Sequence, residues 1–236
     1  MHYYITKTTD RKGGTGKFFA VLGIFFLCVL FFVGIFFWNT RAEVAVSGKN
    51  VYYFLVKDCE ETSVSVVSGD VYRAGGAGFV MNVEGKTSVA LSCYFSLEDA
   101  EAVQTTLAEK GTQTRVMSLS SEEIVFYGKQ SSLCAEHVGH VLTTGRQCAQ
   151  ILYDTANGLE RGILSQEEGL AAVEGVTKVM RGFYGDEELH GRWNVALGEL
   201  VRRGEELSLG ILFSKDVRYF QVQLCSSLAQ ISKYYS

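Results

Sequence analysis

The residues whose types and spacing come closest to a metal site are Cys134, His137 and His140. Thiolate and imidazole groups are the ligands that zinc prefers in proteins. The three residues fall within an expected helix, where each step turns by about 100°, so His140 lies about 240° around the axis from Cys134. Three side chains spread in this way cannot converge on one ion. We predict packing and surface roles for them, and no metal site.

Adjacent acidic residues are the second candidate for chemistry, because a glycosidase uses one carboxyl group as an acid and another as a base or nucleophile. Such clusters occur at Glu60-Glu61, Glu122-Glu123, Glu167-Glu168, Asp186-Glu187-Glu188 and Glu205-Glu206. Two of them lie at expected helix starts, where the helix dipole stabilises a carboxylate. No Gly-x-Ser-x-Gly motif and no catalytic cysteine signature accompanies them. We therefore predict a protein that is not an enzyme and uses no cofactor.

Residues 11–17 read Arg-Lys-Gly-Gly-Thr-Gly-Lys, which resembles the deviant phosphate-binding loop of the ParA-type ATPases. A working loop of this kind needs a preceding strand, a following helix and a hydroxyl group for magnesium. No strand pattern precedes these residues, and Phe18 stands where the hydroxyl group is required. We predict a flexible basic flank that does not bind nucleotide.

Residues 18–38 are uncharged and strongly apolar. At about 1.5 Å per residue, a helix of this length covers the roughly 30 Å hydrocarbon core of a bilayer. A secretory signal has a shorter apolar region, about 7–15 residues, and ends at a small-residue cleavage site, whereas this run ends at Trp38. Basic residues dominate the preceding flank, namely Lys7, Arg11, Lys12 and Lys17. The pattern predicts a single-pass plasma-membrane protein with residues 1–17 in the cytoplasm and the rest outside.

Composition limits the partners of the part that follows the span. The net charge of −4 leaves no broad cationic surface for nucleic acid, and the absence of proline excludes a proline-rich spacer. Residues 39–50 form an expected linker that reaches at most about 40 Å. Of the six cysteines, Cys28 lies in the span, and the odd number that remains indicates free thiols, although an unassigned disulfide stays open.

Residues 51–128 are expected to form one domain with a β-α-β-β-α-β order. Apolar, β-branched runs predict strands at 51–57, 79–83, 87–94 and 112–119. A weak helix is expected at 63–77, and a stronger one begins after Ser96, which can cap it together with Asp99. This order predicts an α+β, ferredoxin-like or split βαβ sheet with both helices on one face.

The stretch at 89–103, VALSCYFSLEDAEAV, resembles the second half of a SPOR domain, in which a strand ending Val-x-Val-Gly-Pro-Phe runs into Ser-x-x-x-Ala and a helix. The following LAEKG and TQTRVMSL also fit, and YYFLVKDC at 52–59 is similar to the first strand of the family. SPOR domains belong to bacterial envelope proteins and bind peptidoglycan that lacks stem peptides, at division or sporulation septa.

The resemblance implies a glycan-binding set on the open face of the sheet, formed by Tyr53, Leu55, Ala90, Ser92 and Tyr94. Tyrosine rings at two of these positions offer stacking surfaces for pyranose rings. The chain departs from the family pattern where Leu55 replaces a glutamine, Lys57 and Ser92 replace glycines, and Cys93 replaces a proline. Leucine removes the donor and the acceptor that a sugar would use.

Residues 129–236 show helical periodicity throughout, with apolar stripes at three- and four-residue spacing. Ser165 and Glu168 form an expected capping box, and Ser214 is expected to cap the last of four helices. The pattern predicts an antiparallel helical bundle. We therefore expect a membrane-anchored envelope protein that binds septal peptidoglycan, a divisome or sporulation protein, or both. The alternative is a membrane-proximal assembly module that has lost glycan binding.

Overall fold

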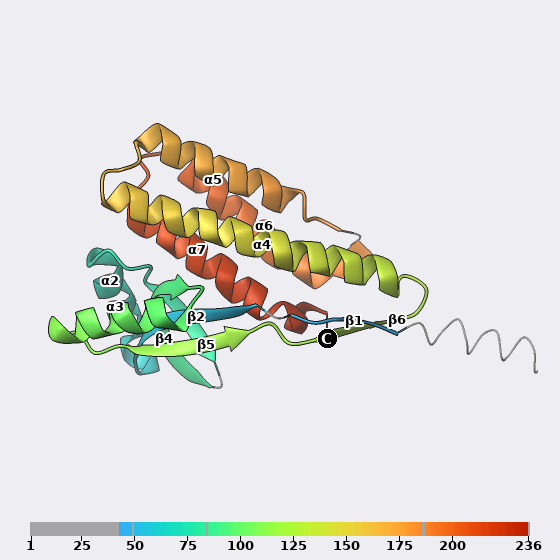
Figure 1. Ribbon diagram of the computed structural model, residues 1–236, viewed down its shortest axis with the longest axis horizontal. Coiled ribbons are helices and arrows are strands. Elements are labelled where there is room, and N and C mark those ends of the chain that lie inside the picture. The colour runs from blue at the N-terminus through green and yellow to red at the C-terminus, as the bar shows by residue number, and fades with distance from the viewer. Residues whose placement is uncertain (1–42, 49, 84, 186, 236) are drawn as a thin grey trace, which may run out of the picture. The chain divides into compact units, whose positions relative to one another are not determined.

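The computed structural model describes residues 43–48, 50–83, 85–185 and 187–235 (Figure 1). The expected cytoplasmic tail at 1–17 and the expected membrane span at 18–38 lie outside these residues, so both stay predictions. Within the described ranges, no helix is both long and apolar enough to cross a bilayer.

The chain is an α+β protein built on a four-stranded antiparallel sheet. Its strands are β2 (Val51–Asp58), β3 (Phe79–Val83), β4 (Lys86–Tyr94) and β5 (Arg115–Ser120), in the order β3-β4-β2-β5. Helix α2 (Val64–Arg73), after the short 3-10 turn η1 (Glu61–Ser63), connects β2 to β3, and α3 (Leu97–Glu109) connects β4 to β5. The predicted β-α-β-β-α-β succession is confirmed.

Both faces of the central strand β2 are apolar, and each face packs against different helices. Tyr52, Phe54 and Val56 are fully buried in the main core with residues of the C-terminal helices. Leu55, on the opposite face, is fully buried against α3 in a smaller cluster. Side chains alternate across a strand, so this division follows directly from the sequence order. The sheet is therefore covered on two sides.

A bulge in β4 changes which side chains share a face. Leu55 pairs with Ser92, but the next residue, Val56, pairs with Ala90, so Leu91 is the extra residue. One extra residue moves the following side chains to the other face. Ser92 therefore lies on the side of α2 and α3, whereas Ala90 belongs to the main core.

The helices after the sheet begin and end close to the predicted positions. They are α4 (Ser131–Glu160), α5 (Gln166–Arg181), α6 (Glu187–Leu207) and α7 (Ser214–Ala229), followed by the short 3-10 turn η2 (Ile231–Tyr234). The predicted capping box is confirmed, because Ser165 accepts a hydrogen bond from the Glu168 backbone and Glu168 accepts one from the Ser165 backbone. Ser214 is the first residue of α7, and Phe213, not Ser214, is its N-cap residue.

Helix α7 lies against the sheet and joins it to the other helices (Figure 1). Its buried Gln221 donates a hydrogen bond of 3.0 Å from Nε2 to the Cys93 carbonyl oxygen of β4. Its Tyr219 ring meets the Phe79 ring of β3 edge-on, with centroids 5.3 Å apart. On its other side, Leu228 packs against α4 where Gly145 has no side chain. One hydrophobic core therefore extends from the sheet into the helices.

A short two-stranded sheet pairs β1 (Glu43–Val46) with β6 (Ile124–Tyr127). The sequence pattern did not predict this pair, and β1 occupies part of the expected linker at 39–50. The strands and helices of Val44–Phe126 and Ser132–Ser236 belong to one compact unit. Sheet and helices therefore share a core within one unit, although two domains were expected.

Two glycines test how closely α5 and α6 pack. A Cβ atom on Gly204 of α6 would lie 2.0 Å from Oγ1 of Thr177, whereas one on Gly175 of α5 would meet nothing within 4 Å. We expect Gly175→Ala to raise the free energy of unfolding by about 0.5–1 kcal/mol, because alanine favours helix. Gly204→Ala makes the same gain, but overpacking costs about 1–3 kcal/mol, so this variant should be less stable. Urea denaturation of the detergent-solubilised chain, followed by circular dichroism, measures both; equal stability of the variants would contradict the packing.

Candidate functional site

A groove of about 520 Å³ lies between α2, α3 and the sheet. Its floor is apolar and comes from Leu55 of β2, Leu91 of β4, and Val103 and Leu107 of α3. One border is formed by Tyr153 and Glu160 from the last turns of α4 and by Arg161, which directly follows the helix. The volume lies within the range of about 300–1,000 Å³ that is usual for ligand sites.

The groove is open on the side of α2 because the residues that directly follow this helix are small. Ala74, Gly75 and Gly76 line it, and Val71 is the one large apolar residue that α2 contributes. Gly75 has a φ of +93°, a conformation that glycine adopts without strain, so the chain can turn back tightly after the helix. The Ala77 backbone N–H then donates to the Leu91 carbonyl oxygen at 2.7 Å. The segment predicted as a weak helix, 63–77, thus forms one wall of the groove, and its small residues leave the groove open.

A buried pair of hydroxyl groups lies at the floor. Ser92 donates a hydrogen bond of 2.8 Å to the Tyr94 hydroxyl, and both residues line the groove. Tyr94 is only 6% exposed, and burial raises the pKa of its phenol, so the group stays neutral at physiological pH. The Tyr153 ring packs edge-on against the Tyr94 ring, with centroids 5.8 Å apart. The floor therefore combines apolar surface with one neutral hydroxyl donor.

Charged residues stand around the groove, and most of them are paired. Arg218 of α7 forms an ion pair with Glu160 and donates hydrogen bonds to the Gly75 carbonyl oxygen at 2.8 Å and to Asn157 Oδ1 at 3.2 Å. Asp70 pairs with Arg73. Lys57 and Arg161 are different, because neither side chain has a hydrogen bond or ion pair with any residue that the structure describes. The groove therefore carries two uncompensated positive charges.

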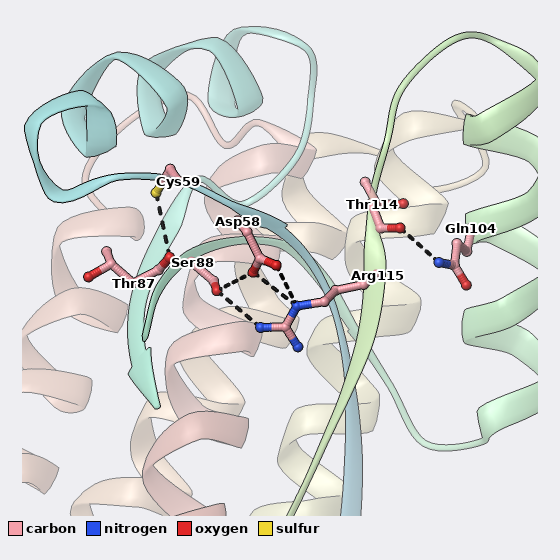
Figure 2. Close-up of polar contacts among 7 residues, drawn as sticks. All are labelled: Asp58, Cys59, Thr87, Ser88, Gln104, Thr114 and Arg115. Atoms are coloured by element: carbon pink, nitrogen blue, oxygen red, sulfur yellow. Dashed lines mark hydrogen bonds and ion pairs between the residues drawn. The ribbon is translucent and has the colours of Figure 1, made fainter. Parts of the chain in front are cut away.

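Next to Lys57, the end of the sheet is held by a polar cluster (Figure 2). Arg115 Nε donates to both carboxylate oxygens of Asp58, at 2.9 and 2.8 Å, and Ser88 Oγ donates to the same carboxylate at 2.7 Å. The hydrogen bond from Arg115 is the main reason that the pKa of Asp58 is lowered. Because Asp58 and Arg115 neutralise each other, the cluster does not compensate Lys57.

The glycan-binding residues that the resemblance implies do not share an open face. Leu55, Ser92 and Tyr94 line the groove on the side of α2 and α3, and the half-buried Tyr53 packs in the same cluster. Ala90 lies on the opposite face, fully buried in the main core, because of the bulge at Leu91. The expected orientation is thus wrong, since one face is covered by α2 and α3 and the other by α7.

Cys134, His137 and His140, the residues with metal-like spacing, do not form one cluster. The His137 ring faces the His190 ring of α6, with centroids 4.5 Å apart, and burial is the main cause of its lowered pKa. His140 packs edge-on against Phe183 at 5.7 Å, and Cys134 is buried. Within the described ranges, no group of side chains is arranged to hold a metal ion.

Sequence reasoning missed Arg161, Tyr153 and Arg218 as members of a site. They come from α4 and α7, far along the chain from the strands that form the floor, and no motif links them. Lys57 did stand out, as a departure from a family glycine. Leu55, Lys57 and Ser92, three of the four departures from the SPOR pattern, line the groove, and the fourth, Cys93, accepts the hydrogen bond from α7.

The Asp58 cluster predicts a pH-dependent stability term. A lowered pKa stabilises the fold above the unfolded-state value of about 3.9, and this term is lost as the pH falls through the folded-state value. We expect Asp58→Asn to lower the free energy of unfolding by up to about 1 kcal/mol at pH 7, because the Asp58 side chain is 57% exposed and solvent screens the pair. At about pH 2 the difference should be smaller. Urea denaturation at both pH values measures it, with Glu174→Gln as the control; an equal loss at both would contradict the ion pair.

A comparison of the chain with protein-family models, with curated proteins and with solved structures finds no match. The resemblance to SPOR domains therefore rests on the residues quoted above.

Proposed function

We propose that this chain is a membrane-anchored, non-enzymatic interaction module in which a SPOR-like domain has lost glycan binding. The strand order β3-β4-β2-β5 with α2 and α3 as connections is that of a split βαβ domain, the fold of the SPOR family. This agreement supports the SPOR-like assignment of residues 51–128. The C-terminal helices then form the antiparallel bundle that accompanies it.

The observation that carries the proposal is the position of α7. A sheet with helices on one face can offer the other face to a ligand, but here α7 packs across it, with Gln221 bonded to the Cys93 carbonyl oxygen. Moving α7 away would expose the fully buried side chains of Phe54 and Phe220, each worth about 1.5–3 kcal/mol on burial. A glycan strand would have to compete with these contacts.

The alternative, binding of septal peptidoglycan, keeps one supporting observation. Tyr94 and Ser92, which the resemblance assigns to glycan, do line a groove, although on the side of α2 and α3. Sugar recognition usually combines aromatic faces with several hydrogen-bonding groups, whereas the floor here is mainly aliphatic. We therefore favour contact with a protein that lies close to the membrane.

Binding to cell walls separates the two functions. The full chain, in mild detergent, is incubated with intact sacculi and with sacculi stripped of stem peptides, and bound protein is measured after sedimentation. We expect no retention on either material above a mock sample, because the sheet faces are covered. A known SPOR-domain protein serves as the positive control. Retention on stripped sacculi alone would overturn the proposal in favour of glycan binding.

Topology is tested with Cys59, the one described thiol that is not buried. We expect a membrane-impermeant maleimide to label intact spheroplasts and Cys59→Ser to abolish this labelling. Burial and the neighbouring Asp58 raise the pKa of the thiol, so labelling should be faster at mildly alkaline pH. A Thr8→Cys chain that also carries Cys59→Ser is the control for the cytoplasmic side. Labelling of Cys59 only after permeabilisation would contradict an external C-terminal part.

A further inference from the structure

The groove between α2 and α3 has two kinds of surface that a single ligand would have to match. Its floor is apolar, formed by Leu55, Val103 and Leu107, and two of its charged side chains, Lys57 and Arg161, lack partners in the described part of the chain. A ligand that fits therefore carries an apolar group and a negative charge.

The charges in the groove favour an anion over a neutral ligand. Arg218 is held by Glu160 and by two further hydrogen bonds, so it is not available to a ligand. Arg161, in contrast, can present its planar guanidinium group to a carboxylate with two parallel hydrogen bonds. Lys57 adds a second cation from the strand side of the groove. Opposite charges across a contact also speed up encounter.

The floor offers one hydrogen-bond donor that the fold does not use. Tyr94 accepts the hydrogen bond from Ser92, so its own O–H proton remains available. Tyr94 is only 6% exposed, and it lines the groove together with Ser92. An acceptor atom of a ligand, such as a peptide carbonyl oxygen, could accept a hydrogen bond from this hydroxyl group.

The form of the groove favours a peptide over an acyl chain. Its rim is polar, because four of the residues that line it, Asp70, Lys57, Glu160 and Arg161, are charged and exposed to solvent. An acyl chain has no group that could use the Tyr94 hydroxyl beyond its single carboxylate. A short peptide end supplies carbonyl oxygens, an apolar side chain and a terminal carboxylate together.

We propose that the groove binds the carboxyl-terminal end of a partner polypeptide whose last residues are apolar. The terminal carboxylate contacts Arg161 and Lys57, and the apolar side chain covers Leu55 and Leu107. The inference rests on the proposed function as a protein-interaction module, and it names the chemistry of the partner and the place of contact.

The test uses the immobilised full chain in mild detergent and two libraries of randomised hexapeptides with an apolar residue at the last two positions. One library has free carboxyl termini and the other is amidated. We expect retention of the free-acid library to exceed that of the amide library at least about tenfold, the scale of a charge-assisted hydrogen bond. Equal retention of the two libraries, or retention of neither, would overturn the proposal.

Variants place the contact in the groove. Arg161→Gln together with Lys57→Gln should reduce free-acid retention about tenfold or more, and Tyr94→Phe should reduce it by a smaller factor. Lys178→Gln together with Lys129→Gln removes the same charge from exposed positions outside the groove and should change nothing. Retention that is unchanged in the Arg161 and Lys57 double variant would overturn the assignment. Circular dichroism checks that each variant is folded.

A competition arm separates peptide from lipid. Dodecanoate is added to the chain with the bound free-acid library. Displacement of bound peptides shows that the two carboxylates share one site and agrees with the proposal, whereas dodecanoate binding without any peptide retention would overturn it. Sedimentation with stripped sacculi gives an independent result: glycan binding there would overturn the proposed function even if peptides bind.

Discussion

The contact of α7 with the sheet is the interaction on which the rest of this structure depends. Gln221 reaches the backbone carbonyl of Cys93 near the end of β4, and the aliphatic and aromatic side chains around it close a core that runs from β2 to α4. If α7 shifted along the sheet, the buried amide of Gln221 would lose this hydrogen bond and would carry a desolvation cost. The hydrogen bond therefore also selects one position of α7 on the sheet. Because α7 occupies that face, any ligand must be sought elsewhere.

The local sequence pattern was sufficient to locate the helices and strands, but it did not show which of them pack together. Apolar periodicity located α4 to α7, and the Ser165 capping box marked the start of α5, because both signals arise within one helix. The run Val51–Asp58, by contrast, is apolar on both faces, so its alternation could not say which helices cover which side. That choice depends on α7, which begins more than 150 residues later in the chain and was expected to pack only with other helices.

The site was even less accessible to sequence reasoning. The extra residue Leu91 reverses the side of Ala90 relative to Ser92, and a bulge of this kind leaves no recognisable mark in the pattern of β4. Arg161 and Tyr153 reach the groove only because α4 ends beside α2. The positions at which the chain departs from the SPOR pattern that it resembles were the useful signal, since Leu55, Lys57 and Ser92 all line the groove.

The pairing of β1 with β6 gives the chain a mechanical property. Strand β1 directly follows the N-terminal 42 residues, and β6 runs straight into the start of α4, so tension applied along the N-terminal side reaches the short pair of strands first. Four-residue strands have few backbone hydrogen bonds to share the load, whereas the eight-residue β2 pairs with β4 over 53–58 and with β5 over 51–56. The small sheet should therefore yield before the large one, so the groove keeps its form under such a load.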